Sequence, residues 1–400
     1  MMNVNRRNAL KTLASVGASA AIAASARFSS ATSPSASAAV PPNWELRDLQ
    51  TISLPGDRYY GWPTLGLRKS GELVVVASGG RRHHVCPFGR VDLLQSFDQG
   101  DSWTFARTIC DGPIDDRDAG IIETPKGTLL ATTFTSLAYV PTLQKALATA
   151  GSEKPSMTAD ELAEWKAAHG RLPEGSHEKQ LGTWMLRSED DGITWSPPYR
   201  VPVNSPHGPV VQSDGRLLYA GKALWTDQDR VGVCQSADDG KTWQWLADIP
   251  TRDGDDHRQY HELHAVECSS GRLIVQIRNH NSPNAGETLQ SHSDDHGATW
   301  SVPRSIGVWG LPSHLLRLAD GRLLMSYGHR RAPLGIQVRL SDDHGDHWSE
   351  PIVLYGDGAS GDLGYPSTVQ QADGSLCTVW YEVLRGNPRS QLRAARWKLL

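Results

Sequence analysis

Histidine is the residue type in this 400-residue chain that is best placed to move protons. Six of the fifteen histidines lie in a loop or near the starts of short apolar segments: His83, His84, His207, His261, His264 and His314. An imidazole titrates near about 6.5 and can donate or accept a proton, although a single one is more commonly a hydrogen-bonded structural residue. No HxH or HExxH spacing supports a metal site, and the five cysteines form no CxxC pair. We therefore expect acid–base chemistry, buried free thiols, and neither metal nor cofactor.

An eight-residue pattern, Ser-x-Asp-x-Gly-x-x-Trp, indicates how such residues are positioned. Its five copies begin at Ser96, Ser188, Ser236, Ser293 and Ser341. The aspartate can accept hydrogen bonds from the amides of a turn, the glycine supplies a positive φ, and the tryptophan packs back across a hairpin. The last four copies begin about 50 residues apart, a period typical of propellers and solenoids.

Six similar units surround these copies, each with a Gly/Pro or polar opening, an apolar segment, a turn and a second apolar segment. The openings are Gly61–Thr64, Asp118–Gly120, Pro206–Pro209, His261–Leu263, Gly310–Ser313 and Gly364–Ser367. The sixth unit lacks the pattern, so the strand-like segment Glu45–Leu54 is predicted to complete it and close the ring. The chain also has 38 glycines, 24 prolines and 14 tryptophans, which favours an all-β fold. We predict a six-bladed β-propeller over residues 41–400, without exposed sheet edges.

One insertion interrupts the second unit at about 134–182. Within it, Thr158 to Gly170 has a capping box at its start and a glycine stop at its end, which predicts a helix. Long insertions in propellers lie on a rim. The insertion is therefore either a rim decoration or a lid or wall over the central pocket.

Residues 1–40 are typical of a twin-arginine export signal followed by a linker. Arg6 and Arg7 precede an alanine-rich stretch, and Ala-x-Ala-like sites follow at 24–26 and 36–38. A membrane anchor is the alternative, but the stretch is short and rich in alanine and serine. We therefore predict a periplasmic or secreted protein with no membrane span after processing. The net charge of −4, with no basic stripe, argues against a nucleic-acid partner.

The repeated hairpins resemble those of the sialidase superfamily, and the resemblance extends from about Glu45 to the C-terminus. It implies a site on the propeller axis, at the starts of the innermost strands. That site uses a tyrosine nucleophile, a glutamate that takes its proton, an aspartate acid/base and three arginines that hold the substrate carboxylate. The hairpins are specific for the fold and not for an activity.

Several residues match this implied site. Tyr365 matches the nucleophile and Glu262 the glutamate, which a phenol with a free pKa near about 10 needs as a base. Less distinctive matches are Arg278 and, more loosely, Arg331 for the substrate carboxylate, with Glu382 as a supporting carboxylate. The structural alternatives are inter-blade ion pairs for both arginines and a packed strand residue for the tyrosine.

Two departures concern the first unit. The family usually opens it with Arg-Ile-Pro, whereas this chain has Gly61-Trp62-Pro63, so one arginine is absent. The loop that usually carries the aspartate reads Gly80 to Pro87 and has no carboxylate. We expect Arg81 or Arg82 to supply the missing positive charge. The candidates for the missing acid/base are His83, His84 and Asp118, and the further pocket residues are expected to be Trp62, His207 and His314.

Three functions are compatible with these residues, and all involve a carbohydrate partner. The first is a retaining exo-glycosidase that releases a terminal acidic sugar. The second is a sialidase-like polysaccharide lyase or histidine-dependent uronic-acid enzyme, in which His83 or His84 and Tyr365 move protons at C5 and C4. The third is a non-catalytic glycan-binding propeller, although a binder has no need of the Glu262 and Tyr365 pair.

Overall fold

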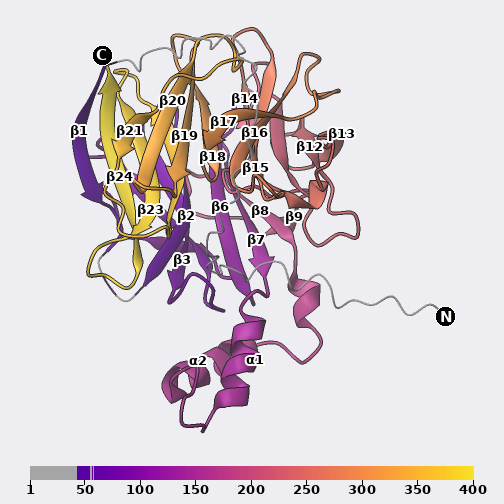
Figure 1. The fold of residues 1–400 in the computed structure, drawn as a ribbon, viewed down its shortest axis with the longest axis vertical. Coiled ribbons are helices and arrows are strands. Elements are labelled where there is room, and N and C mark those ends of the chain that lie inside the picture. Colours follow the sequence, from indigo (N-terminus) through magenta and orange to yellow (C-terminus); the bar gives the residue numbers. More distant parts are fainter. Residues whose placement is uncertain (1–42, 55, 57) are drawn as a thin grey trace, which may run out of the picture. The chain divides into compact units, whose positions relative to one another are not determined.

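The structure, a computed structural model, describes residues 43–54, 56 and 58–400. The predicted export signal lies outside these residues. The described chain forms six four-stranded antiparallel sheets, the blades of the predicted propeller (Figure 1). Blade 1 comprises β2 (Tyr59–Leu67), β3 (Leu73–Arg81), β4 (Arg90–Ser96) and β5 (Arg107–Cys110). Blade 2 comprises β6 (Asp115–Glu123), β7 (Leu129–Ser136), β8 (Thr183–Ser188) and β9 (Tyr199–Arg200). Blade 3 comprises β10 (Val210–Val211), β11 (Leu217–Lys222), β12 (Val231–Ser236) and β13 (Gln244–Asp248).

The second half of the chain continues the same order. Blade 4 comprises β14 (Tyr260–Glu267), β15 (Leu273–Asn279), β16 (Glu287–Ser293) and β17 (Arg304–Trp309). Blade 5 comprises β18 (Ser313–Arg317), β19 (Leu323–His329), β20 (Gly335–Ser341) and β21 (Ile352–Tyr355). Blade 6 comprises β22 (Leu363–Gln370), β23 (Leu376–Val383), β24 (Ser390–Leu399) and β1 (Trp44–Thr51). Four of the six predicted openings thus lie within the innermost strands, while Pro206–Pro209 directly precedes β10 and Gly310–Ser313 ends at the first residue of β18.

Blade 6 joins the two ends of the described chain, as predicted. Its outermost strand, β1, pairs antiparallel with β24, from Trp44 opposite Leu399 to Thr51 opposite Arg393 (Figure 1). Trp44 also contacts Trp397 edge to face, with ring centroids 6.3 Å apart. This pairing closes the ring, because β1 supplies the fourth strand of blade 6.

The repeated pattern forms the predicted hairpin turns. In the first copy, Asp98 accepts hydrogen bonds from the Ser102 amide (2.9 Å) and from the Ser96 hydroxyl (2.8 Å). The Gly100 amide donates to the same Ser96 hydroxyl at 2.8 Å. Hydrogen bonds from the Ser102 hydroxyl and amide lower the pKa of Asp98 to about 2. The aspartate therefore stays ionised and holds the turn as an acceptor.

The core lies between adjacent blades. Residues of β14 and β15 such as Leu263, Ile277 and Val275 pack with Val233 of blade 3 and are fully buried. Four of the five cysteines are buried and all five are free thiols, while Cys110 is half-buried. Inner strands such as β3 and β15 are buried along almost their whole length, whereas outer strands such as β1, β5 and β17 are partly exposed.

The insertion lies between β7 and β8 and contains two helices, α1 (Val140–Thr149) and α2 (Ala159–His169), with a 3₁₀ turn at His177–Gln180. α2 begins and ends where the sequence predicts: the Thr158 hydroxyl accepts from the Glu161 amide at 3.2 Å, and Gly170 ends the helix. In Figure 1 both helices project beyond one end of the sheets. Their small core also includes Cys86 and the neighbouring Phe88 from blade 1, so the insertion supports the loop after β3.

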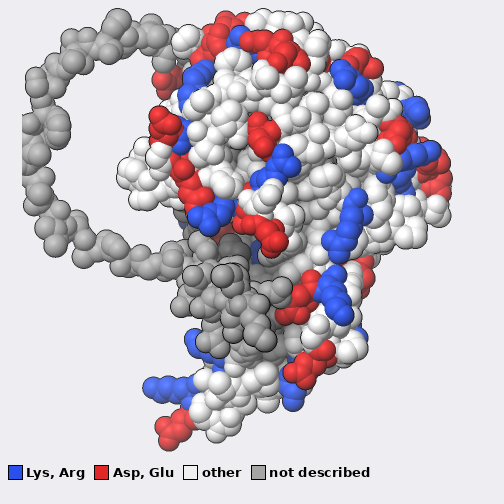
Figure 2. All heavy atoms as spheres, turned by 90° about the vertical axis from the view of Figure 1, so that its right-hand side faces the viewer, with Lys and Arg blue, Asp and Glu red and all other residues white. Residues whose placement is uncertain are grey.

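The surface carries charges of both signs. On the face shown in Figure 2, lysines and arginines are interspersed with aspartates and glutamates, and no extended basic stripe is visible. Among the described residues, no helix has the length and apolar character that crossing a bilayer requires.

Candidate active site

The starts of four innermost strands have an unusual backbone that directs their side chains. Trp62, Asp118, Glu262 and Tyr365 have φ values of 53°, 44°, 47° and 54°, each at a shift of strand register. Non-glycine residues seldom adopt positive φ, at a cost on the order of 1–3 kcal/mol each. A bulge also interrupts the alternation of side chains and re-aims one of them. The same backbone strain thus recurs at the openings of four units. The side chains of these four residues lie in contact or within electrostatic range of one another.

Tyr365, Glu262 and Arg278 form one hydrogen-bonded cluster. The Tyr365 hydroxyl donates to Glu262 Oε1 at 2.5 Å, and Arg278 Nη1 donates to Glu262 Oε2 at 2.6 Å. Arg278 Nη1 also lies 3.3 Å from the Tyr365 hydroxyl. Burial alone would raise the pKa of Glu262, but Arg278 and the Tyr365 hydroxyl lower it to about 2. Burial, and then the charges of Glu262 and Asp118, raise the pKa of Tyr365 well above 10. In the resting site the phenol therefore keeps its proton and the glutamate is ionised.

Asp118 supplies the second carboxyl group of this region. Its residue is buried, and its carboxyl makes no hydrogen bond to another described residue. Burial, and then the negative charge of Glu262, raise the pKa of Asp118 to about 7. A carboxyl that titrates near neutrality can donate a proton in one step and accept it in the next. The structure thus brings one of the three predicted acid/base candidates next to the Tyr365 cluster.

An aromatic wall adjoins the cluster. The Trp62 ring lies 6.4 Å from that of Tyr365 and 6.2 Å from that of Tyr381, and the two tyrosine rings are 5.9 Å apart. Arg330 reaches this wall, with Nη2 donating to the Tyr381 hydroxyl at 3.4 Å and Nε to the Leu363 carbonyl at 2.9 Å. Trp62 therefore adjoins the Tyr365 cluster.

The predicted site residues Arg331 and Glu382 make other contacts. In each case a sequence neighbour contacts the aromatic wall or is part of it. The guanidinium of Arg331 stacks on Trp309 at 3.8 Å, and the adjacent Arg330 faces the cluster. Glu382 is buried in an ion pair with Arg393 at 3.1 Å. Tyr381, next to Glu382 on β23, contacts Trp62 instead. Successive side chains of an extended segment point to opposite sides, so an assignment that is wrong by one residue selects a side chain that points the other way.

His84 borders the aromatic wall and His83 does not. His84 Nδ1 lies 2.9 Å from the Tyr59 hydroxyl and 3.1 Å from Asp362 Oδ1, and its ring lies 5.0 Å from that of Trp62. Asp362 also accepts from the hydroxyls of Tyr59 (2.9 Å) and Tyr381 (3.2 Å). Burial opposes ionisation of Asp362, but hydrogen bonds from His84 and then the tyrosines lower its pKa.

His83 belongs to the contact between the blade 1 loop and the insertion. Its Nε2 lies 2.6 Å from Glu161 of α2, and the adjacent Arg82 pairs with Glu164 of the same helix at 2.9 Å. The insertion therefore holds the loop that carries His84. This placement favours the wall interpretation of the insertion over the decorative one.

Three histidines form a buried layer on consecutive innermost segments of blades 3, 4 and 5. The ring centroids of His207, His264 and His314 lie 4.5–5.3 Å apart. His264 Nδ1 accepts from the Leu315 amide at 2.9 Å, which leaves the proton of a neutral ring on Nε2. Burial lowers the pKa of His314 to about 3 and those of His207 and His264 well below 6.5. The predicted pocket residues His207 and His314 are thus buried, neutral packing residues.

Arg81 is buried and already neutralised. Its Nη1 and Nη2 bond the two oxygens of Asp115 at 2.5 and 3.0 Å, and its guanidinium lies 4.8 Å from the Trp62 ring centroid. Neither Arg81 nor Arg82 therefore supplies a free positive charge. Arg117, Tyr59 and Asp362 were not predicted from the sequence. Arg117 had one available signal, its position next to Asp118 at a strand opening.

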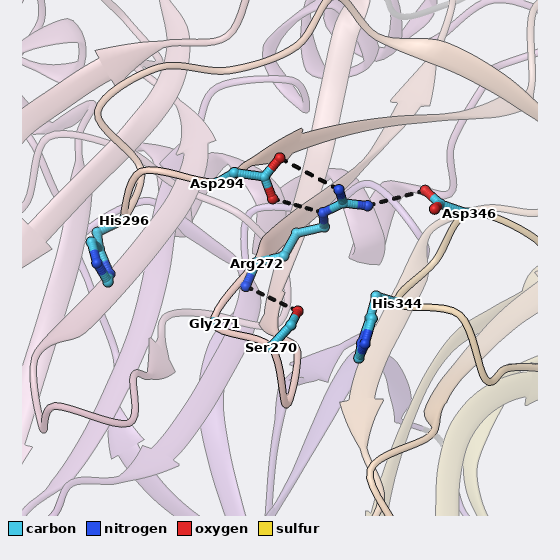
Figure 3. A pocket seen from close by; sticks show the side chains of 7 residues that line it. All are labelled: Ser270, Gly271, Arg272, Asp294, His296, His344 and Asp346. Atoms are coloured by element: carbon cyan, nitrogen blue, oxygen red, sulfur yellow. Dashed lines mark hydrogen bonds and ion pairs between the residues drawn. The ribbon is translucent and has the colours of Figure 1, made fainter.

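A surface pocket of about 450 Å³ lies apart from these residues, at the opposite end of the strands of blades 4 and 5 (Figure 3). Arg272 crosses it and pairs with Asp294 at 2.8 Å and Asp346 at 3.1 Å. His296 and His344 point along its two sides. Its arginine is already paired between two hairpins, so we interpret this pocket as an inter-blade clamp.

Comparisons with known proteins concern the family and the fold of the chain. The profile of a family described as BNR repeat-like domain matches residues 159–377. A sialidase from Micromonospora viridifaciens is 30% identical over 151 residues, which is 35% of this chain and 23% of that protein. The match thus spans about a quarter of that relative's length.

Solved structures show the same fold. A protein of unknown function from Dyadobacter fermentans superposes with a TM-score of 0.72 at 22% identity, over 90% of this chain and all of that one. The NanB sialidase from Streptococcus pneumoniae superposes with a TM-score of 0.61 at 14% identity, over 87% of this chain and 70% of that one. At these identities the likeness concerns the fold alone.

Proposed function

The chain belongs to the BNR repeat-like domain family and has a sialidase-like propeller, and we propose that it is a retaining glycoside hydrolase that releases a terminal acidic sugar. The observation that carries the proposal is the Tyr365 hydroxyl, which donates to Glu262 at 2.5 Å while Arg278 holds the other Glu262 oxygen. A tyrosine paired in this way matches the requirement of an activated nucleophile: a base within hydrogen-bond reach and a third group that orients the base.

The proposed reaction has two steps. In the first, Tyr365 Oη attacks the anomeric carbon and passes its proton to Glu262, while Asp118 protonates the departing glycosidic oxygen. In the second, Asp118 removes a proton from water, whose oxygen attacks the anomeric carbon. The phenol then leaves and recovers its proton from Glu262. A neutral phenol approaches a carboxylated sugar without the repulsion that a carboxylate nucleophile would meet.

The charges of the pocket support an acidic substrate. Arg278 and Arg330 both face the aromatic wall, and Arg330 has hydroxyl and carbonyl partners without a carboxylate. A planar guanidinium can bond both oxygens of a carboxylate at once. We also propose that the protein is exported, because residues 1–40 have the composition of a twin-arginine signal.

The test is incubation with acidic glycosides, with mass and NMR readout. Hydrolysis adds one water, and a retaining mechanism first yields the product with the anomeric configuration of the substrate. A slow fluorinated acidic glycosyl donor should add one sugar mass to the peptide that contains Tyr365. A first product of inverted configuration, or a sugar adduct on another peptide, would contradict the proposed mechanism.

A second function is favoured by the contact of His84 with Tyr59 and Asp362. This exposed imidazole beside a phenol could move the C5 proton of a uronate, as a polysaccharide lyase requires. Elimination would leave an unsaturated product that absorbs in the ultraviolet and has no added water. Saturable glycan binding without either product would instead indicate the non-catalytic function.

A further inference from the structure

The guanidinium groups of Arg81 and Arg117 both lie over the Trp62 ring, but the two arginines differ in their other contacts. The Arg81 guanidinium lies 4.8 Å and the Arg117 guanidinium 4.4 Å from the Trp62 ring. Arg81 is fully buried, and its terminal nitrogens donate hydrogen bonds to Asp115, the Ser78 hydroxyl and backbone carbonyls. Its role is structural, because its charge is matched by a carboxylate that is equally buried.

Arg117 has no such partner. No hydrogen bond or ion pair joins its guanidinium to another described residue, and its Nε is buried without an acceptor. The Nε atoms of Arg81 and Arg278 are also buried without an acceptor, but the terminal nitrogens of these two arginines pair with carboxylates. The residue as a whole is half-buried, so part of the side chain remains accessible. A buried donor on a charged group without an acceptor is costly, and such groups are rare in folded proteins. The position of this one, one residue before Asp118, places it at the candidate active site.

Stacking on Trp62 determines how Arg117 can bind a ligand. A guanidinium that lies against an indole keeps its N–H groups in its own plane, where they point past the ring edge. That edge suits a planar oxyanion with two oxygens, because two parallel N–H···O bonds can form. The other arginines near Tyr365 are less free, since Arg278 is held by Glu262 and Arg330 by Leu363 and Tyr381.

We propose that Arg117, supported by the Trp62 ring, binds the carboxylate of the acidic sugar. This inference rests on the proposed function and adds a residue to it: the positive charge that is absent from the opening of blade 1 is supplied from blade 2. Arg117 and Asp118 then act on one sugar from one bulge, the first on its carboxylate and the second on its glycosidic oxygen.

The experiment measures binding of free monosaccharides by calorimetry, so that it does not depend on turnover. The probes are N-acetylneuraminic acid and glucuronic acid, with N-acetylglucosamine as the neutral sugar and N-acetylglucosamine 6-sulfate as the sulfated one. The variant is Arg117→Gln, with Arg117→Lys to restore charge without the planar fork. The matched control is Arg331→Gln, which removes an arginine that also stacks on a tryptophan but lies outside the cluster. Circular dichroism melting verifies that each variant is folded.

We expect Arg117→Gln to weaken binding of the acidic sugar that the parent prefers by at least about tenfold, the loss of one bidentate contact. Arg117→Lys should recover part of that loss, and Arg331→Gln should bind as the parent does. Parent-like binding by a folded Arg117→Gln overturns the inference. Equal affinity of the parent for the sulfated and carboxylated sugars overturns the assignment to a carboxylate.

Failure of this inference can be separated from failure of the proposed function. Hydrolysis of acidic glycosides that depends on Tyr365, together with an unchanged KM in Arg117→Gln, removes only the role of Arg117. A parent protein that neither binds nor hydrolyses any acidic sugar removes both.

Discussion

The protonation state of Asp118 should control the rate of the first glycosidic step. Burial and the charge of Glu262 raise the pKa of Asp118 to about 7. The first step needs the protonated carboxyl, so about nine tenths of the enzyme is competent at pH 6 and about one tenth at pH 8. We therefore expect kcat/KM to fall about tenfold between these two pH values. The measurement is a pH profile of kcat/KM, which reports groups of the free enzyme.

Replacing the carboxyl should remove this descending limb. Asp118→Asn is expected to lower kcat on a natural glycan by about 10² to 10⁴, the usual contribution of general acid catalysis, and to leave the residual rate independent of pH near 7. The loss should be smaller on a 4-methylumbelliferyl glycoside, whose leaving group needs little protonation. His83→Ala and His84→Ala are the controls and should keep the limb. A limb that persists in Asp118→Asn, or that disappears in His84→Ala, would refute the assignment.

Three further predictions concern the cluster and the buried histidines. Tyr365→Phe removes one hydroxyl and no packing volume, so it should lower kcat more than about a hundredfold with an unchanged melting temperature; a near-parental kcat would exclude the covalent step. Arg278→Lys should raise KM for acidic substrates and leave the affinity for neutral sugars unchanged, whereas equal kinetics on acidic substrates would make Arg278 an inter-blade residue. Burial holds the pKa of His207 well below 6.5, so below about pH 6.5 the unfolded chain binds more protons there and stability falls as pH falls. His207→Phe should flatten the slope of unfolding free energy against pH by about 1 kcal/mol per unit on average in urea titrations at pH 5.0 to 6.5, and an unchanged slope would contradict this.

The repeating turns made the fold predictable from sequence. Ser96, Asp98 and Gly100 bond one another within five residues, so the pattern specifies a hairpin without help from distant segments. With the four further copies, the pattern marks five of the six blades, and the strand-like segment that begins near Glu45 supplies the closing strand of the sixth. The first insertion helix, α1, was not predicted, because its start lacks a side-chain cap.

The site was only partly predictable, because directions within a strand depend on single-residue register. Tyr365 and Glu262 were recognised from motifs that include their bulges, and both lie in the cluster. Arg331 and Glu382 each lie one residue away from a residue at the aromatic wall: Arg330, which contacts the wall, and Tyr381, which is part of it. Partners from remote blades, such as Asp362 beside Tyr59, have no local signal at all, since 303 residues separate them in the chain.

In the proposed mechanism, the bulge in β6 lets two adjacent residues of blade 2 take the roles of the arginine and the aspartate that are absent from blade 1. On a regular strand Arg117 and Asp118 would point to opposite faces, and at most one of them could reach the pocket. The register shift between Arg117 and Gly120, with φ of 44° at Asp118, breaks that alternation. Arg117 consequently lies on Trp62 while Asp118 remains in electrostatic range of Glu262. The strain at this bulge thus has a specific consequence: it places a cation and a proton donor side by side, where a straight strand would separate them.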